Sequence, residues 1–312
     1  MKRISEREAR EILEVSAEAR TNYPPAALEK DLHLTFILRE LANISQTQNG
    51  LVLAGGTSLV KGYRLFDRMS EDLDFKLDQK DIYTTSQLRV QLSKFRFSLI
   101  KLFESLDFEV MTSHSNNENR FFTIDLAYER AFESISSLRP TIKLEFFSSK
   151  SIARSELKPI TSLLCASLDS AEEAFDFPCA APSQTATEKL IGFLNRFYSD
   201  HYPRDERLIR HIHDIYYIIN GGTTIEEIAL LFPAIFQEEL DRFGHTSKNI
   251  GPDRVNHLIN SLKNFESDHE LNDTYEKFIS ELTVGNGIAF SQAKQFFINL
   301  AGACIQQLSN AN

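Results

Sequence analysis

Two aspartates one residue apart, Asp72 and Asp74, lie in a segment that alternates between polar and apolar side chains. Because side chains alternate between the two faces of a strand, both carboxylates should project the same way, about 7 Å apart. Carboxylates on one face repel each other unless a cation lies between them. Mg²⁺ prefers oxygen ligands and shares them readily with the phosphates of a nucleotide. The pair predicts a magnesium site, and the plain alternative is a solvated strand face.

A pair of glycines precedes these aspartates. Gly55 and Gly56, followed by Thr57 and Ser58, end a short apolar run that predicts a strand, and the segment from Thr57 to Phe66 predicts a helix. Glycines let the backbone approach a ligand closely, and the N–H groups at a helix start favour an anion such as phosphate. The alternative is a tight turn without a ligand. A short helix would return the chain beside the glycines, so one stretch would supply a phosphate cradle and a metal site.

A site with two metal ions needs a third carboxylate from a neighbouring strand. The segment TIKLEFF places Lys143 and Glu145 on one face of a predicted strand and apolar residues on the other. An acidic side chain in such a strand is costly to bury without a partner. A metal would explain Glu145, and so would pairing with Lys143 or a solvated edge. Asp125, in FFTIDLAYE, is the second candidate.

The periodicity predicts an α+β chain with two domains. Helices are predicted over 4–20, 26–44 and 86–106, and strands over 51–54, 72–77, 108–112, 120–127, 141–147 and 157–163. From Ser183 onward the pattern is helical, over 183–199, 205–220, 224–230, 232–242, 253–265, 271–282 and 290–309. We place the boundary near Pro178–Pro182, which gives domains 1–180 and 181–312.

Composition limits the setting in which the protein works. The 312 residues carry a net charge of −10, so any contact with nucleic acid must come from a local basic patch. The three cysteines are far apart and form no CxxC pair, which argues against disulfides and a cysteine-rich zinc site. No apolar run approaches the roughly 18 residues of a membrane span. We expect a cytoplasmic protein without a membrane partner.

Two predicted helical faces in the C-terminal part mix cations with small or aromatic residues. The faces consist of Lys189, Gly192, Phe193 and Arg196, and of Arg207, Arg210, His211 and Asp214. Solvated surface is the plain reading of such faces. Close to a carboxylate cluster, however, they favour a cleft that binds phosphate. Zinc at His211 and His213 is disfavoured, because residues two apart diverge on a helix and no cysteine is near.

The motifs together resemble a known family. GGTSL (residues 55–59), then Tyr63, then RMSEDLDF (68–75) resemble the nucleotidyltransferases of DNA polymerase β type, and more narrowly the AbiEii/AbiGii-type toxins. LEKDLHLTFILREL (28–41) resembles that family's N-terminal helix, and residues 186–218 resemble a later helix pair. The resemblance implies a polymerase-β-like mixed-sheet domain, an N-terminal helical segment and a C-terminal all-α domain. It spans residues 28–220, with a helical tail beyond.

The resemblance also implies roles for single residues. It makes Gly55, Gly56 and Ser58, with Thr57 beside them, the triphosphate cradle, and Asp72 and Asp74 the Mg²⁺ ligands. Lys189 would sit near the phosphates, Asp214 would close the site, and Glu145 would be the third metal ligand or the base. In the mechanism that we expect, Arg196 joins Lys189 in offsetting the phosphate charge. This chain departs from the family's usual pattern at two places. The family's usual Arg-Asp-x-x-Asp run is Arg210-His211-Ile212-His213-Asp214 in this chain, and Glu145 replaces a commoner aspartate.

The expected activity is the Mg²⁺-dependent transfer of a nucleotide from an NTP to an acceptor hydroxyl. By resemblance the acceptor is an RNA, such as a tRNA 3′ end, and the protein is the toxin of an abortive-infection type system with an antitoxin encoded nearby. A second reading keeps the fold and makes the acceptor a small molecule or a protein. A third is a partner protein that binds NTP without catalysis.

Overall fold

The computed structural model describes most of the chain, and its helices and strands are those of the described residues. The described residues are 1–18, 21–45, 50–66, 68–78, 84–135, 138–150, 155–168, 174–198, 205–243, 254–283 and 287–311. The chain forms two compact units. The sheet unit comprises Met1–Arg64 and Arg68–Ala180, and the helical unit comprises Leu65–Asp67 and Ala181–Asn312.

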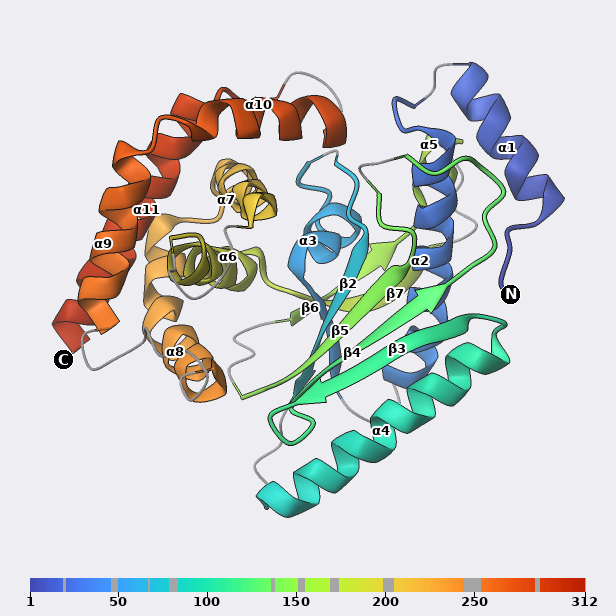
Figure 1. The fold of residues 1–312 in the computed structure, drawn as a ribbon, viewed down its shortest axis with the longest axis horizontal. Coiled ribbons are helices and arrows are strands. Elements are labelled where there is room, and N and C mark those ends of the chain that lie inside the picture. The colour runs from blue at the N-terminus through green and yellow to red at the C-terminus, as the bar shows by residue number, and fades with distance from the viewer. Residues whose placement is uncertain are drawn as a thin grey trace. The chain divides into compact units, whose positions relative to one another are not determined.

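The sheet unit is built on one mixed sheet of seven strands in the order β3-β4-β5-β2-β1-β7-β6 (Figure 1). The strands are β1 (Leu51–Ala54), β2 (Asp72–Asp78), β3 (Glu109–Asn116), β4 (Phe121–Ala127), β5 (Ile142–Ser149), β6 (Ser155–Ile160) and β7 (Phe175–Ala180). Parallel pairing joins β2 to β5 and β1 to β7, and the other neighbours are antiparallel. The central strands β1 and β2 are antiparallel to each other, and each is parallel to its other neighbour. The sheet is therefore mixed, as the sequence predicts.

The alternating pattern of β2 separates an apolar face of the sheet from a polar one. Leu73 and Phe75 are fully buried, and Phe75 stacks on Phe146 of β5 with ring centroids 5.0 Å apart. Asp72 and Asp74 project from the opposite face. Burying the apolar face removes hydrocarbon from water, which supplies most of the drive to form the sheet. The polar face is thereby left to carry charged groups.

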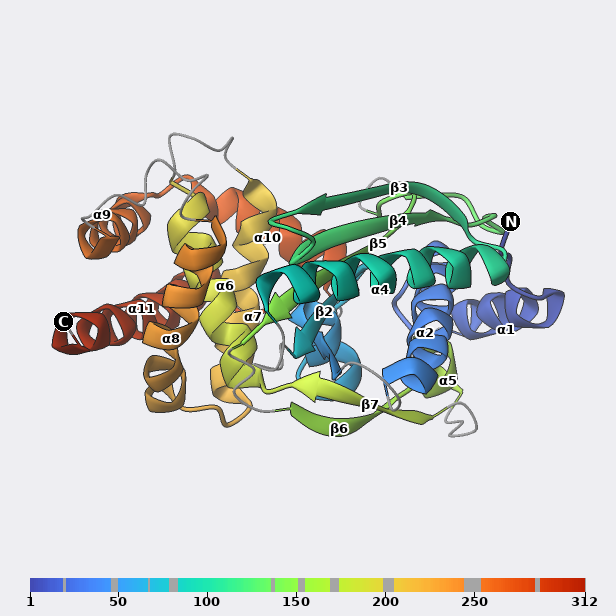
Figure 2. The same ribbon diagram turned by 90° about the horizontal axis from the view of Figure 1, so that it is seen from below.

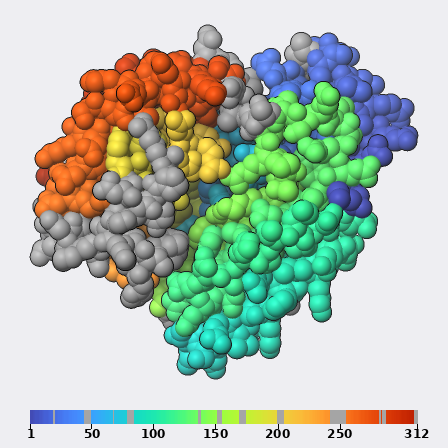
Figure 3. All heavy atoms as spheres, in the orientation of Figure 1, coloured from blue at the N-terminus to red at the C-terminus, as the bar shows by residue number. Residues whose placement is uncertain are grey.

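Six helical segments accompany the sheet. They are α1 (Glu6–Ala17), α2 (Pro25–Ser45), α3 (Gly55–Thr57), the π-helical turn Ser58–Gly62, α4 (Thr85–Ser105) and α5 (Leu163–Ser167). Helix α4 lies along β3 and β4 in Figure 2, and Figure 3 shows both strands (green) at the surface with α4 (teal) beside them. Capping boxes begin α1 at Ser5 and α4 at Thr84, which satisfies backbone N–H groups that a helix start leaves without partners.

Helix α2 holds buried charged residues and uses them to bind loops. The Glu29 carboxylate accepts backbone N–H groups of Ala131 at 2.6 Å and Phe132 at 3.2 Å. Asp31 pairs with Lys61 of the π-helical turn at 2.6 Å. A buried carboxylate costs free energy unless such partners are present, so these contacts fix the loops that they reach.

The helical unit consists of α6 (Pro182–Arg196), the 3-10 turn Glu206–Ile209, α7 (Arg210–Asn220), α8 (Ile225–Phe243), α9 (Arg254–Ser267), α10 (Leu271–Leu282) and α11 (Phe290–Ala311). Phe193, Phe265 and Phe297 form its aromatic centre, with ring centroids 4.9 to 5.1 Å apart. The short segment Leu65–Asp67 belongs to this unit. In it, the Phe66 ring lies 5.6 Å from the ring of His213.

Several predicted elements differ from the observed ones. The predicted helix from Thr57 to Phe66 is wrong: a three-residue α-helical turn and a π-helical turn end at Gly62. The helices predicted over 224–230 and 232–242 are one helix, α8, which contains Pro233. A proline removes only one helical hydrogen bond, and the packed surface of α8 outweighs that loss. Strand β7 and helix α5 were not predicted.

No helix in the described ranges is long and apolar enough to cross a membrane.

Candidate active site

The register of the central strands brings three predicted acidic residues together. Parallel pairing of β2 with β5 sets Asp72 opposite Lys143 and Asp74 opposite Glu145. Side chains of paired residues project from the same face, so Asp74 and Glu145 are neighbours on the polar face of the sheet. The side chains of Asp72 and Glu145 are 24% and 21% exposed, so solvent reaches both. The two strands thus supply a row of carboxylates that a ligand can reach.

Gly55 lies directly against one of these carboxylates. Its φ is +65°, a conformation that favours glycine. A Cβ atom at this position would lie 2.0 Å from Oδ2 of Asp74 and 2.9 Å from its Cγ. The preceding residue, Ala54, pairs with Asp74 in the antiparallel register of β1 and β2. The glycine is therefore needed both for the turn of the chain and for its close approach to Asp74.

Gly56 makes a second close approach, to a buried arginine. A Cβ atom on Gly56 would lie 2.6 Å from a terminal guanidinium nitrogen of Arg68 and 3.1 Å from the Ser70 hydroxyl. Arg68 is only 4% exposed and donates to the Met69 carbonyl at 2.9 Å. Arg68 was not predicted from the sequence as a site residue. The structure places this cation beside the glycine turn.

The two hydroxyl residues after the glycines both make contacts within the sheet unit. Thr57 donates to the Asp72 carbonyl and its hydroxyl lies 2.8 Å from the Ser70 hydroxyl. Ser58 is fully buried and donates to the Ala180 carbonyl at 3.4 Å. Thr57 therefore joins the glycine turn to the start of β2, where the aspartates stand, and Ser58 joins it to β7.

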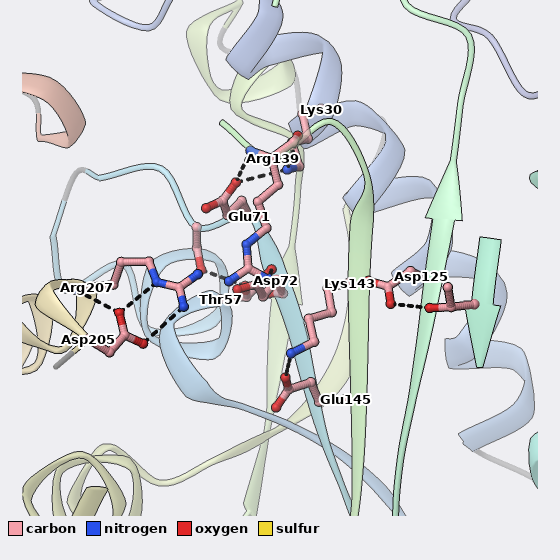
Figure 4. Close-up of polar contacts among 12 residues, drawn as sticks. Lys30, Thr57, Glu71, Asp72, Asp125, Arg139, Lys143, Glu145, Asp205 and Arg207 are labelled. Atoms are coloured by element: carbon pink, nitrogen blue, oxygen red, sulfur yellow. Dashed lines mark hydrogen bonds and ion pairs between the residues drawn. The ribbon is translucent and has the colours of Figure 1, made fainter. Parts of the chain in front are cut away.

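Cationic side chains accompany the carboxylates (Figure 4). Arg139 approaches Asp72 with 3.5 Å between Nη1 and Oδ1, and Lys143 forms an ion pair with Glu145. The pairing of Glu145 with Lys143 is one of the alternatives that the sequence left open. Across the described ranges, no three His, Cys, Asp or Glu side chains are grouped so that they could hold a metal ion. Asp72 and Glu145 instead face their cations.

The residues of this face can be compared with the ligands that a divalent metal needs. Carboxylate oxygens are the ligands that Mg²⁺ prefers. Asp74 and Glu145 are lateral neighbours in the register, and the Asp74 carboxylate packs against the backbone of Gly55, where a Cβ would otherwise lie. The residue types fit a divalent metal, which Glu145 could join only by exchanging Lys143 for it. The rival, Asp125, pairs with Lys143 in the register of β4 and β5 and accepts a hydrogen bond from Thr112 at 2.7 Å.

A buried lysine of α2 stabilises the backbone around Asp72. Lys30 is fully buried, and its Nζ lies 3.0 Å from both Oε2 of Glu71 and the Arg139 carbonyl. The same Glu71 oxygen accepts the Arg139 N–H at 2.8 Å. Burial lowers the pKa of Lys30. Burial would raise the pKa of Glu71, but Lys30 and the Arg139 N–H outweigh it, so that this pKa is lowered. The sequence signal that could have indicated Lys30 was the presence of charged residues in a helix that is otherwise largely apolar.

The helical unit holds its own group of predicted residues. Lys189 of α6 forms an ion pair with Asp214 of α7 at 2.8 Å, and the Asp214 side chain is fully buried. His211 places Nδ1 3.1 Å from the Lys189 carbonyl. Burial, followed by the charges of Lys189 and Arg196, holds the pKa of His211 well below its usual value, so this ring is neutral. A neutral ring keeps the cluster from gaining another positive charge.

The remaining cations of these helices contact their own helices or turns. Arg196 donates to the Gly192 carbonyl at 3.2 Å, and a Cβ on Gly192 would lie 2.9 Å from the Arg196 guanidinium. Arg207 pairs with Asp205 at 2.8 Å, also drawn in Figure 4, and its side chain is 61% exposed. Arg196 and Arg207 thus lie near the surface of the helical unit, where a polyanion could reach them.

This chain shares its fold, a mixed sheet with a glycine turn against an Asp-x-Asp strand followed by a helical unit, with a solved nucleotidyltransferase structure. The structure is similar to MenT4, a nucleotidyltransferase toxin from Mycobacterium tuberculosis H37Rv. The TM-score is 0.58 at 17% identity, and the match covers 95% of this chain and 87% of that one. A nucleotidyltransferase-like protein from Paracoccidioides brasiliensis matches at a TM-score of 0.36, with 16% identity over 67% of this chain and 89% of that one.

The sequence places the chain in a family within that class. Residues 37–295 match the family described as the nucleotidyl transferase AbiEii toxin of type IV toxin–antitoxin systems, and the chain belongs to this family. It is accordingly a nucleotidyltransferase that uses an NTP and is accompanied by an antitoxin. The match reaches 75 residues beyond the 28–220 of the motif resemblance at its C-terminal end. No curated protein sequence matches the chain at a significant level.

Proposed function

We propose that the protein transfers a nucleotide from an NTP to the hydroxyl of an RNA acceptor, the 3′ end of a tRNA in the first instance, and acts in this way as the toxin. The observation that carries the chemistry is the position of Asp74. It lies beside Glu145 in the strand register, and its carboxylate packs against the Cβ-free backbone of Gly55. Carboxylates, a close glycine turn and family membership support one site for a triphosphate.

The roles proposed for the residues follow from their positions. Gly55 and Gly56 offer backbone to the triphosphate, and Arg68 beside Gly56 offsets its charge. Asp72, Asp74 and Glu145 are the proposed metal ligands. Bound Mg²⁺ would supply charge stabilisation at the attacking and leaving oxygens. Because Thr57 and Ser58 already bond within the sheet unit, they support the cradle by fixing its backbone.

The proposed reaction balances without another reactant. The acceptor oxygen attacks the α-phosphorus, a new P–O bond forms, and the bond to the β-phosphate oxygen breaks, which releases pyrophosphate. Glu145 takes the proton of the acceptor hydroxyl, for which it must leave Lys143. Lys189 and Arg196 are proposed to offset phosphate charge. Asp214, which forms an ion pair with Lys189, holds that lysine in place.

The RNA acceptor rests on the resemblance to the family and on the exposed cations of the helical unit. A small molecule or a protein hydroxyl would need the same carboxylates, so the acceptor must be identified directly. The purified protein is incubated with each α-labelled NTP and with total RNA, a protein extract or a metabolite extract. We expect label in RNA of tRNA size, and Asp74→Asn should abolish it because the charge is lost while the shape is nearly kept.

A second experiment connects the chemistry to the toxicity. Wild-type protein and Asp74→Asn are expressed at matched levels in a bacterial host, with and without the antitoxin gene. We expect growth arrest by the wild type only, and relief of the arrest by the antitoxin. Equal toxicity of both proteins would reject nucleotide transfer as its cause. Label in protein or in small molecules would replace the RNA acceptor and leave the transferase chemistry in place.

A further inference from the structure

The backbone of Arg139 is bound from both sides by an ion pair that is almost completely buried. Lys30 donates to its carbonyl at 3.0 Å, and Glu71 accepts its N–H at 2.8 Å. Lys30 and Glu71 bind each other at 3.0 Å, and their side chains are 0% and 11% exposed. Residues from α2, from the start of β2 and from the loop before β5 therefore meet at one point, as Figure 4 shows.

This point adjoins Asp72 in two ways. Glu71 precedes Asp72 in the chain, so its carboxylate fixes the backbone at the start of β2. The side chain of Arg139 reaches Asp72 with 3.5 Å between Nη1 and Oδ1. Lys30 thus holds Glu71, which precedes Asp72, and the backbone of Arg139, whose side chain forms an ion pair with the Asp72 carboxylate.

Stability alone is a weak reason for such a pair. Removing a lysine and a carboxylate from water is costly, and well-packed apolar residues of similar volume often replace a buried ion pair without loss of stability. An apolar pair could not bind both the carbonyl and the N–H of Arg139. The feature that only the ion pair supplies is therefore the fixed position of Arg139 beside Asp72.

We propose that Lys30 and Glu71 are positioning residues that orient Asp72 for the divalent metal through Arg139. Arg139 offsets the charge of Asp72 before the metal arrives and keeps the carboxylate from turning away from Asp74. Neither Lys30 nor Glu71 touches the nucleotide. This inference rests on the proposed role of Asp72 as a metal ligand.

The test measures metal binding directly, without catalysis. Mn²⁺ replaces Mg²⁺ as the probe, and its dissociation constant for the full-length protein is measured by electron paramagnetic resonance. Partners that orient metal ligands typically contribute about 10- to 100-fold to metal affinity. We expect a loss of that size in Lys30→Met and in Glu71→Gln. Glu29→Gln is the matched control, because Glu29 is a buried carboxylate one residue from Lys30 that binds the same loop at Ala131 and Phe132, away from Arg139.

A double variant separates positioning from stability. Lys30→Met/Glu71→Met removes both charges together, so its thermal stability should recover relative to Lys30→Met, whereas Mn²⁺ binding should stay weak. Wild-type Mn²⁺ affinity in Lys30→Met, or recovery of affinity together with stability in the double variant, would overturn the proposal. A wild-type protein that binds no Mn²⁺ would instead refute the metal site itself, so the two failures can be told apart.

Discussion

Gly55→Ala tests the site at the point where its geometry is tightest. The substitution adds a single methyl group, which would lie 2.0 Å from Oδ2 of Asp74. It also forces an alanine into φ +65°, where a residue with a Cβ is strained by about 1–2 kcal/mol. Two effects are therefore combined, namely backbone strain and displacement of the Asp74 carboxylate, and each needs its own measurement.

The size of the displacement follows from the contact. Ordinary van der Waals contact begins at 3.4 Å, so the Asp74 oxygen or the turn must move by roughly 1.4 Å. A misplacement of about 1 Å at a reacting centre can lower the rate about 100-fold. We expect Gly55→Ala to lose at least that factor in the initial rate of nucleotide transfer, at saturating NTP and metal.

Gly222→Ala is the matched control for the strain. Gly222 has φ +105°, and a Cβ there would meet nothing within 4 Å. Both variants should lose free energy of unfolding by urea, by about 1–2 kcal/mol from strain. Only Gly55→Ala should also lose activity. Nearly full activity of Gly55→Ala would show that the Asp74 carboxylate need not lie where the structure has it, and would refute the assignment.

Three further predictions concern single side chains. Lys189→Met should weaken NTP binding by equilibrium titration, and it should also cost about 3–5 kcal/mol in unfolding free energy, because Asp214 stays buried without its cation. Unchanged affinity with that loss of stability would make Lys189 purely structural. His33 is buried between Tyr128 and Phe108, and burial lowers its pKa to about 4 from 6.5. The unfolded chain therefore takes up the proton first, and stability should fall as pH drops from 6.5 toward 4, by about 2 kcal/mol between pH 7 and 4.5 relative to His33→Phe in urea titrations. A pH-independent difference between the two proteins would contradict the assignment of a neutral His33. Lys143→Gln removes the cation that faces Glu145, so the Mg²⁺ concentration for half-maximal transfer should fall, and a rise would argue that Lys143 binds substrate.

The sequence predicted the central strands well because their signal is local. In β2 the apolar residues Leu73 and Phe75 alternate with the aspartates, and this pattern alone fixes the face on which the carboxylates stand. The same reasoning failed after Gly56. The segment to Phe66 has the composition of a helix, but its last residues leave the sheet unit and pack in the helical unit. Tertiary packing outweighed local helix propensity there.

The partners of the carboxylates could not be predicted in the same way. Lys30 and Arg139 are 109 residues apart, and no periodic pattern connects them. Lys143 was recognisable as a neighbour of Glu145 only because both lie on one face of one strand. Contacts within an element follow from its period, whereas contacts between elements depend on how the chain packs. The acidic residues of the polar face could therefore be predicted from the sequence, whereas most of the cations beside them could not.

The segment Leu65–Asp67 also constrains how the protein is made. It is part of the helical unit, and Phe66 contacts the ring of His213 there. The ribosome synthesises Phe66 early, and Arg68–Ala180, the larger part of the sheet unit, follows before His213 appears. The helical unit therefore cannot complete its core from its own contiguous sequence. Its residue Phe66 lies in the chain between β1 and β2, and it can pack in that core only after the helices from Ala181 onward have been translated. A fragment of residues 181–312 would lack this ring, so we expect a gene cut at that point to yield a weakened helical unit.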